Sequence, residues 1–348
     1  MKIEAMEQLL TPKKLVIRTA LALVVLAAVI LVCSTIGAES ISFRAVFSGP
    51  GVEVTDNPDY EIFVKFRLPR ILLACLVGAA LACSGVVFQA LLRNPLADPY
   101  ILGISSGAGL GAMIAVVSGL NWTVWGRSPI AVFAFVGASA TVWLVWFIGR
   151  LTGKFHVTGL LLAGVVVNAF FSALIMFITS IAKADRVYAT IFWLMGNMTE
   201  GDFLTLWVAA GCVGGGMLAL FFISPQLNAL SLGGDDARSM GVNITRTRTL
   251  AFAVAAAITA IAVSLSGLIG FVGLVIPHAV RLVFGPDHRQ LLPLSGIVGA
   301  MFLVVADTLA RVIIAPAQLP VGVVTAIVGG PFFLVLLVKY SRKVGRLK

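Results

Sequence analysis

Charged residues are scarce in this sequence. Only 11 % of the 348 residues are Asp, Glu, Lys or Arg, whereas 59 % are hydrophobic and the mean hydropathy is +1.05. A soluble globular chain carries roughly 25 % charged residues, and it rarely exposes large apolar patches to water. The scarcity of charge therefore excludes a soluble protein and indicates an integral membrane protein.

Cysteine and histidine are also few. The four cysteines lie inside apolar runs without a CxxC pair, and the three histidines are isolated, so neither a disulfide framework nor a metal site is indicated. No series of Asp, Glu or His crosses the apolar runs, which disfavours a secondary transporter with a proton relay. A membrane-embedded enzyme would need an acid/base or metal constellation. We expect no catalytic residue and no bound metal or cofactor.

Long apolar runs dominate the chain instead. A membrane span needs about 20 mainly apolar residues. Eight runs meet this requirement, and two shorter, glycine-rich runs complete a single all-α domain over residues 1–348. The ten predicted helices cover residues 15–37, 68–92, 99–118, 129–149, 158–181, 202–223, 249–268, 268–282, 293–312 and 320–339.

The basic residues give this topology an orientation. With ten spans, 17 of the 25 Lys and Arg residues fall in the segments on one side and 8 on the other. Cytoplasmic loops carry the excess of Lys and Arg, so both termini are predicted to be cytoplasmic. Because the basic residues lie at the ends of apolar runs and form no polar face, a nucleic-acid partner is not expected.

Glycine and proline concentrate in two segments, at 94–112 and 266–282. Each follows a Ser-Gly pair at the end of a longer apolar run. Interrupted helices at matching places in two halves suggest an inverted repeat. The alternative is that Gly and Pro are simply common in membrane helices.

Two further features lie near the ends of the predicted helices. Asp307 and Arg311 are four residues apart in the ninth span, a spacing that predicts an ion pair on one helix face. The longest cytoplasmic segment, 224–248, is polar and compatible with helix. The outer segment at 182–201 is amphipathic enough for a short surface helix.

The chain resembles the FecCD family of permease subunits of ATP-driven importers for ferric siderophores, haem and vitamin B12. The resemblance lies in four motifs: RLPR (67–70) with GAALACSG (78–85), QALLRNPLADPYILGISSGAGLGA (89–112), GLIGFVGLVIPHAVR (267–281) and LPVGVVTAIVGGPFF (319–333). It implies a homodimer in the bacterial inner membrane. The implied partners are two cytoplasmic ATPase subunits, which use ATP and Mg, and a periplasmic binding protein.

The resemblance also implies roles for outer arginines. Arg67, Arg70 and Arg311 match family positions that receive acidic residues of the binding protein, a task that suits the bidentate guanidinium. Asp307 would orient Arg311. The alternatives are interfacial snorkelling for Arg67 and Arg70, and pairing with Asp307 alone for Arg311.

At the inner side, the stretch LGGDDARSMG (232–241) resembles the family's coupling loop. We expect its small residues at spacing four to seat against the ATPase, although an ordinary polar loop with a glycine cap would also explain them. Two turns would help to close the channel to the cytoplasm. The coupling residues are Leu232, Gly233, Ala237, Arg238 and Gly241, and the gate candidates are Asn94, Leu96, Val157 and Thr158.

The substrate is the least defined feature. The resemblance favours a ferric siderophore, with cobalamin and haem as alternatives, and a secondary transporter as a remote one. All three importer substrates are bulky, so selectivity is expected to reside mainly in the binding protein.

Overall fold

The structure is a computed structural model that describes residues 10–37, 39–49, 57–120, 128–151, 157–198 and 203–345. These residues form helices and connecting segments without a β-strand. Within these described ranges, seven helices are long and apolar enough to cross a membrane. They are α2 (Pro12–Thr35), α5 (Leu68–Leu92), α7 (Pro129–Leu151), α8 (Val157–Ile181), α10 (Phe203–Phe222), α13 (Ile244–Ser266) and α15 (His288–Val312).

Three further apolar helices of the described residues complete the set, namely α6 (Ile104–Ser118), α14 (Val272–Phe284) and α16 (Val321–Gly345), of which Val321–Val335 is the apolar stretch. Each corresponds to a predicted span, and the all-helical membrane fold is confirmed. The observed bounds differ from the predicted ones by up to six residues, as at the end of α16, which is Gly345 rather than 339. Helix α15 begins at His288 rather than 293, because the Asp287 side chain caps it by accepting a hydrogen bond from the Arg289 amide.

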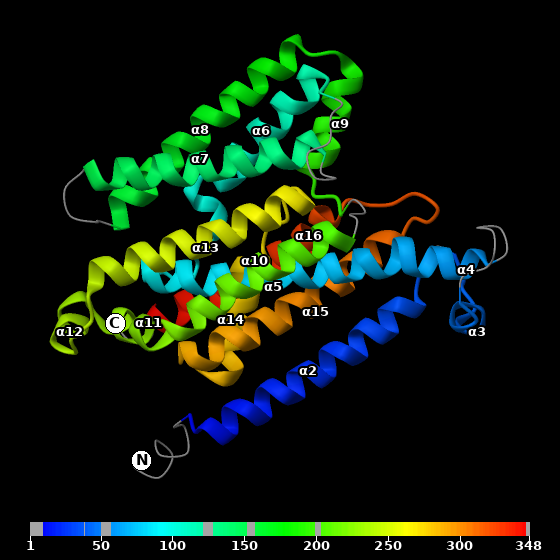
Figure 1. The fold of residues 1–348 in the computed structure, drawn as a ribbon. Helices are drawn as coiled ribbons and strands as arrows, with labels where there is room; N and C mark the ends of the chain where they lie inside the picture. The colour runs from blue at the N-terminus through cyan, green and yellow to red at the C-terminus, as the bar shows by residue number, and fades with distance from the viewer. Residues whose placement is uncertain are drawn as a thin grey trace.

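Helix α5 is the centre of the bundle. In its most apolar stretch 78 % of the residues are buried, whereas none are buried in the corresponding stretch of α2. Helices α13, α14 and α15 surround α5, while α6, α7 and α8 form a group on the far side of α13 (Figure 1). The chain continues helically before α5 through α4 (Pro58–Glu61) and the π-helix η1 (Ile62–Arg67).

Glycine lets α5 and α15 approach closely. A Cβ on Gly78 would lie 2.2 Å from the carbonyl oxygen of Gly299, and a Cβ on Gly299 would lie 2.4 Å from that of Gly78. Likewise, a Cβ on Gly85 would lie 1.9 Å from the oxygen of Gly273 in α14. In lipid, where helix association depends on close packing, small residues are needed at such crossings.

The two interrupted segments predicted from glycine and proline lie against each other. The first contains the 3₁₀ turn η2 (Pro99–Leu102), and the second is the non-helical stretch 267–271 before α14. The Tyr100 hydroxyl donates to the carbonyl of Ile269 (3.0 Å) and accepts from its amide (3.1 Å). One side chain thus satisfies backbone groups where the helix is broken, as a lipid environment requires. The inverted repeat itself stays a prediction.

Short helices cap the two ends of the bundle. Helices α11 (Ser224–Leu232) and α12 (Gly234–Ser239) share one end with the start of α2 and the end of α16 (Figure 1). Helices α3 (Phe43–Phe47), α4 and α9 (Ala184–Leu194) lie at the opposite end. The predicted surface helix within 182–201 is therefore confirmed as α9, and the 224–248 segment is largely helical.

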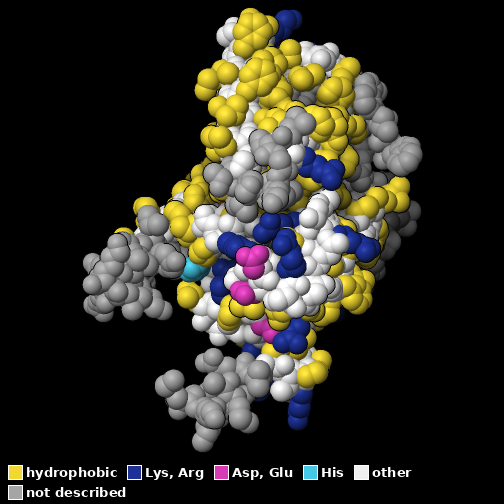
Figure 2. All heavy atoms as spheres, turned by 90° about the vertical axis from the view of Figure 1, so that its left-hand side faces the viewer, with side chains coloured by type: hydrophobic (Ala, Val, Ile, Leu, Met, Phe, Trp, Pro, Cys, Tyr) yellow, Lys and Arg dark blue, Asp and Glu magenta, His cyan; other side chains and the backbone are white. Residues whose placement is uncertain are grey.

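The end that carries α11 and α12 is basic. Figure 2 looks onto it and shows Lys and Arg side chains gathered near its centre, with hydrophobic side chains around them. We call it the basic end, and the end with α3, α4 and α9 the opposite end. Since Lys and Arg mark cytoplasmic surfaces, the basic end is the expected cytoplasmic one.

The glycine crossing generates a stability prediction. Gly78→Ala should destabilise the protein by about 1–3 kcal/mol, because the added methyl meets backbone rather than a movable side chain. Gly211→Ala is the matched control, since nothing lies within 4 Å of a Cβ at this position in α10. Thermal unfolding in detergent should show a lower midpoint for Gly78→Ala alone. Equal midpoints would contradict close α5–α15 packing.

Candidate functional site

Three buried arginines gather at the opposite end of the bundle. Arg67, Arg70 and Arg311 are 5 %, 7 % and 7 % exposed. Arg67 ends η1, Arg70 lies in the first turn of α5, and Arg311 lies in the last turn of α15. Since α5 and α15 pack along their length, residues from distant parts of the sequence meet here.

A single carboxylate links two of these arginines. Asp307, 1 % exposed, accepts a hydrogen bond from Arg70 Nε at 2.9 Å and another from Arg311 Nε at 3.0 Å. The predicted pairing of Asp307 with Arg311 is therefore confirmed. The pairing with Arg70 and the contact from Arg70 Nη1 to Gln318 Oε1 (2.8 Å) were not predicted, because nothing in the sequence relates residues about 240 positions apart.

Arg67 is held differently, by backbone carbonyls. Its Nη1 donates to Ser34 (2.9 Å) and its Nη2 donates to Glu39 (2.8 Å), at the end of α2 and just beyond it. Gly37 makes room for this guanidinium, because a Cβ there would lie 2.2 Å from Arg67 Nη2. The cluster therefore carries three cations and one carboxylate. Its excess positive charge is suited to an acidic partner, and its docking role stays a prediction.

The coupling stretch at the basic end is a pair of short helices. Gly233 separates α11 from α12 with a φ of 159°. Gly241 ends α12 with a φ of 79°. The amide of Gly241 donates to the Arg238 carbonyl, and the amide of Val242 donates to that of Ala237, both at 3.0 Å. This is a Schellman motif, in which glycine adopts the left-handed conformation after the helix.

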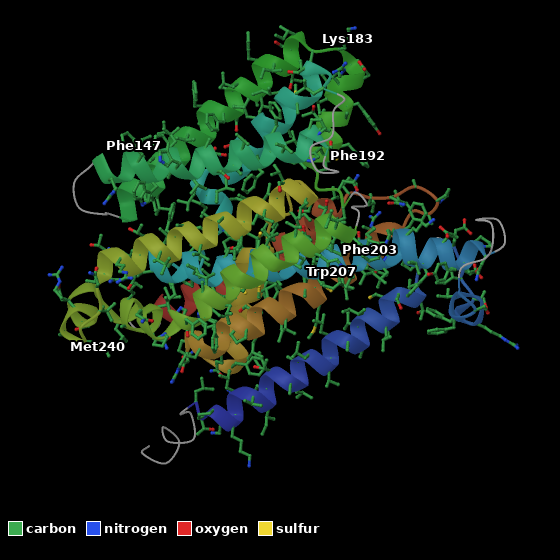
Figure 3. The ribbon with its side chains drawn as sticks, in the orientation of Figure 1. Phe147, Lys183, Phe192, Phe203, Trp207 and Met240 are labelled. Atoms are coloured by element: carbon green, nitrogen blue, oxygen red, sulfur yellow. The ribbon has the colours of Figure 1, made fainter. Side chains whose placement is uncertain are left out.

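The exposed surface of this pair differs from the predicted small-residue face. Ala237 is fully buried, so its methyl group faces the protein, and it cannot contact a partner from the predicted position. The exposed side chains include Leu232 and Met240, at 69 % and 63 %, together with Arg238. Figure 3 shows Met240 at the outer edge of α12. The spacing indicated a shared face but could not show which way that face points.

The turn after α5 contains two of the gate candidates. Arg93 ends the helix in a left-handed conformation, and the Asn94 side chain accepts a hydrogen bond from the Leu96 amide at 2.9 Å. Asn94 is exposed and Leu96 is half-buried at the basic end. The other two candidates, Val157 and Thr158, begin α8. Their role as a gate stays a prediction.

The described residues contain no group of three or more His, Cys, Asp or Glu that could hold a metal ion. Polar side chains are concentrated instead at the two ends. Between them, helices such as α8 and α10 present exposed apolar side chains, including Phe170 and Trp207. This distribution fits a protein that spans a membrane and contacts polar partners on both sides.

Comparison with protein families gives a match over most of the chain. The model of the FecCD transport family matches residues 23–339. Among curated relatives, the hemin transport system permease protein HmuU of Yersinia pestis is 38 % identical over 318 residues, covering 91 % of this chain and 94 % of that protein. The vitamin B12 import system permease protein BtuC of Escherichia coli is 39 % identical, covering 82 % and 86 %.

One more curated relative and one solved structure also match this chain. The Fe(3+)-citrate import system permease protein YfmE of Bacillus subtilis is 35 % identical, covering 94 % of this chain and 97 % of that protein. Among solved structures, a metal-chelate type ABC transporter in an inward-facing conformation superposes with a TM-score of 0.80. It is 31 % identical and covers 94 % of this chain and 100 % of that one.

The buried arginine cluster generates a second stability prediction. Asp307→Asn should destabilise the protein by about 3–5 kcal/mol, because two buried guanidinium groups lose their shared carboxylate. Glu61→Gln removes the carboxylate of the more exposed pair with Lys65 and should cost about 0–1 kcal/mol. Thermal unfolding in detergent tests this difference. Equal, small losses would show that Asp307 does not hold the cluster together.

Proposed function

Because this chain belongs to the FecCD transport family, and is thus a multi-pass permease of an ABC importer, we propose that it imports an iron complex. In this proposal two copies form the path across the bacterial inner membrane, and a periplasmic binding protein delivers the substrate. The observation that carries the proposal is the segregation of charge, with a basic end and a buried arginine cluster at opposite ends of an apolar bundle. In this proposal, one soluble partner binds at each end.

The outer partner is proposed to dock over the arginine cluster. Arg67, Arg70 and Arg311 bring three guanidiniums together, and within the described part of the chain Asp307 is the one carboxylate that pairs with them. In a dimer, this surplus charge occurs twice. A binding protein with an acidic residue on each lobe would be attracted to both copies, and electrostatic complementarity of this kind raises the association rate and fixes orientation.

The inner partners are proposed to be two ATPase subunits that contact α11 and α12. Leu232 and Met240 are exposed there beside charged side chains, and an apolar centre with a polar rim is typical of protein interfaces. In this proposal ATP and Mg are bound by the ATPase, so the permease itself catalyses no reaction.

The substrate is proposed to be a ferric siderophore, with haem and cobalamin as alternatives. The relatives support a metal chelate as the substrate. They do not distinguish between the three candidates, since their names include hemin, vitamin B12 and Fe(3+)-citrate import. Uptake into proteoliposomes that contain the permease and its ATPase, measured with each ligand on its binding protein, tests the choice. Uptake that requires internal ATP is expected. Uptake driven by an ion gradient without ATP would instead support a secondary transporter.

The exposed residues of the coupling pair generate a further prediction. Leu232→Glu combined with Met240→Glu should strongly reduce co-purification of the ATPase, because two charges replace the apolar centre of the proposed interface. Phe47→Glu is the control, since Phe47 is 86 % exposed on α3 at the opposite end. Undiminished co-purification of the double variant would show that the ATPase docks elsewhere.

A further inference from the structure

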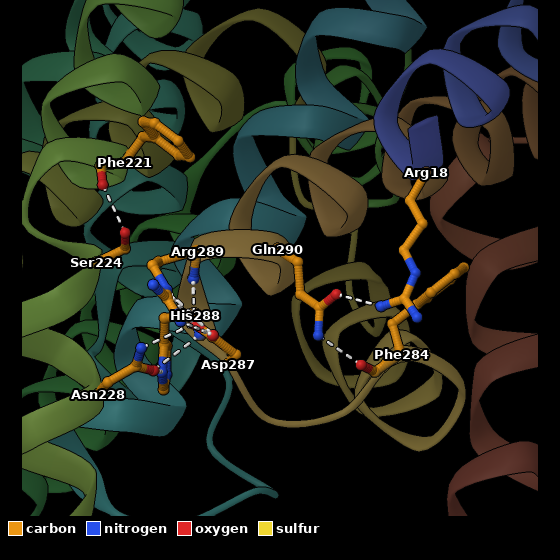
Figure 4. A network of polar contacts seen from close by, with 9 residues as sticks. All are labelled: Arg18, Phe221, Ser224, Asn228, Phe284, Asp287, His288, Arg289 and Gln290. Atoms are coloured by element: carbon orange, nitrogen blue, oxygen red, sulfur yellow. Dashed lines mark hydrogen bonds and ion pairs between the residues drawn. The ribbon is translucent and has the colours of Figure 1, made fainter. Parts of the chain in front are cut away.

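A cavity of about 860 Å³ opens at the basic end, bordered by Leu232 of the proposed ATPase contact. Its walls come from five helices and the segments that follow them. Figure 4 shows part of this wall, where α2 approaches the turn between α14 and α15. The charged and polar lining includes Arg18, Arg93, Asn228, Arg281, Asp287 and His288.

The cavity has an excess of positive charge. Three arginines line it against one carboxylate, that of Asp287. Burial raises the pKa of Asp287, but hydrogen bonds from Arg289 and Asn228 outweigh it and lower that pKa to about 2. The carboxylate is therefore ionised, and Arg289 neutralises it by donating from Nε to Oδ1 and from Nη2 to Oδ2. Among the residues that the structure describes, no carboxylate forms an ion pair with Arg18, Arg93 or Arg281.

Within the described residues, several polar atoms in this wall lack hydrogen-bond partners. Arg281 Nη1 is a buried donor without an acceptor, and Gln89 Oε1 is a buried acceptor without a donor. His288, 4 % exposed, is in contact through Nδ1 with Asn228 Oδ1 at 2.7 Å, and its Nε2 has no partner. Because the Asn228 oxygen can only accept, Nδ1 carries the proton and Nε2 is an acceptor. Buried polar atoms are normally paired, so a ligand with an anionic group and hydroxyl groups would complete this wall.

The rim of the cavity is apolar on the side of α14. Leu282 and Val283 line the cavity and are 67 % and 74 % exposed. Arg18 closes another side from α2, the helix with no buried residue in its most apolar stretch. It donates from Nη1 to Gln290 Oε1 at 2.6 Å and lies over the Phe284 ring. The cavity therefore opens beside the exposed apolar side chains of α2, and its apolar rim is suited to a ligand with apolar tails.

We propose that this cavity binds the headgroup of an anionic phospholipid whose phosphodiester carries a hydroxylated group, such as phosphatidylglycerol. Arg281 Nη1 donates to a phosphate oxygen, as guanidinium groups do with charge-assisted hydrogen bonds. Gln89 Oε1 and His288 Nε2 accept from the headgroup hydroxyls. The bound lipid joins α2 to α5 and α14 beside the end of α11.

Native mass spectrometry of the delipidated permease tests this site. The expected result is that phosphatidylglycerol binds and that phosphatidylcholine with the same acyl chains does not displace it. Arg281→Gln should weaken phosphatidylglycerol binding about tenfold, because a charge-assisted hydrogen bond is lost. Arg150→Gln, which removes an exposed arginine over Trp146 outside the cavity, should change it less than about twofold.

A second variant keeps the test valid if Arg281→Gln does not fold. Arg18 lies on the peripheral helix α2. Arg18→Gln should also weaken phosphatidylglycerol binding, and its thermal midpoint without lipid should equal that of the unmodified permease. The proposal is overturned if both cavity variants bind phosphatidylglycerol like the unmodified permease. It is also overturned if millimolar inorganic phosphate alone displaces the lipid, because the occupant would then be a soluble phosphate compound.

Discussion

The absence of water around the helices is the constraint on which this structure depends. In hydrocarbon, each backbone group and each charge has to find its partner within the protein. Tyr100 meets this requirement where the chain is broken, by bonding both the amide and the carbonyl of Ile269. Asp307 meets it for two arginines at once. These contacts allow irregular backbone and buried charge inside a bundle that otherwise consists of apolar helices.

The same constraint separates the functions of the molecule in space. The middle of the bundle is held together by close helix packing, as at Gly78 and Gly299, and not by charged groups. The charged clusters lie at the two ends. At one end arginines surround the carboxylate of Asp307, and at the other they line a cavity near Arg281. In the proposed function, soluble partners supply energy and selectivity, so the permease itself provides a path and responds to those partners.

Much of the fold could be predicted from the sequence, since spans are set by local apolar length. The ten helices follow from runs of apolar residues, and the pairing of Asp307 with Arg311 follows from helical spacing. What could not be predicted depends on which elements meet. The second partner of Asp307 lies in α5, and the burial of Ala237 depends on how α12 packs against the bundle. Likewise, the start of α15 at His288 depends on a cap from Asp287 rather than on hydropathy.

The central claim is that the basic end faces the cytoplasm and the arginine cluster faces outward, because both proposed docking surfaces depend on it. Single cysteines at Met240 and Phe47, exposed at the two ends, would be introduced into a permease whose four native cysteines are replaced. A membrane-impermeant maleimide applied to intact spheroplasts should label the cysteine at position 47 and should label that at 240 only after lysis. Labelling of both positions from the outside, or of 240 alone, would contradict the account.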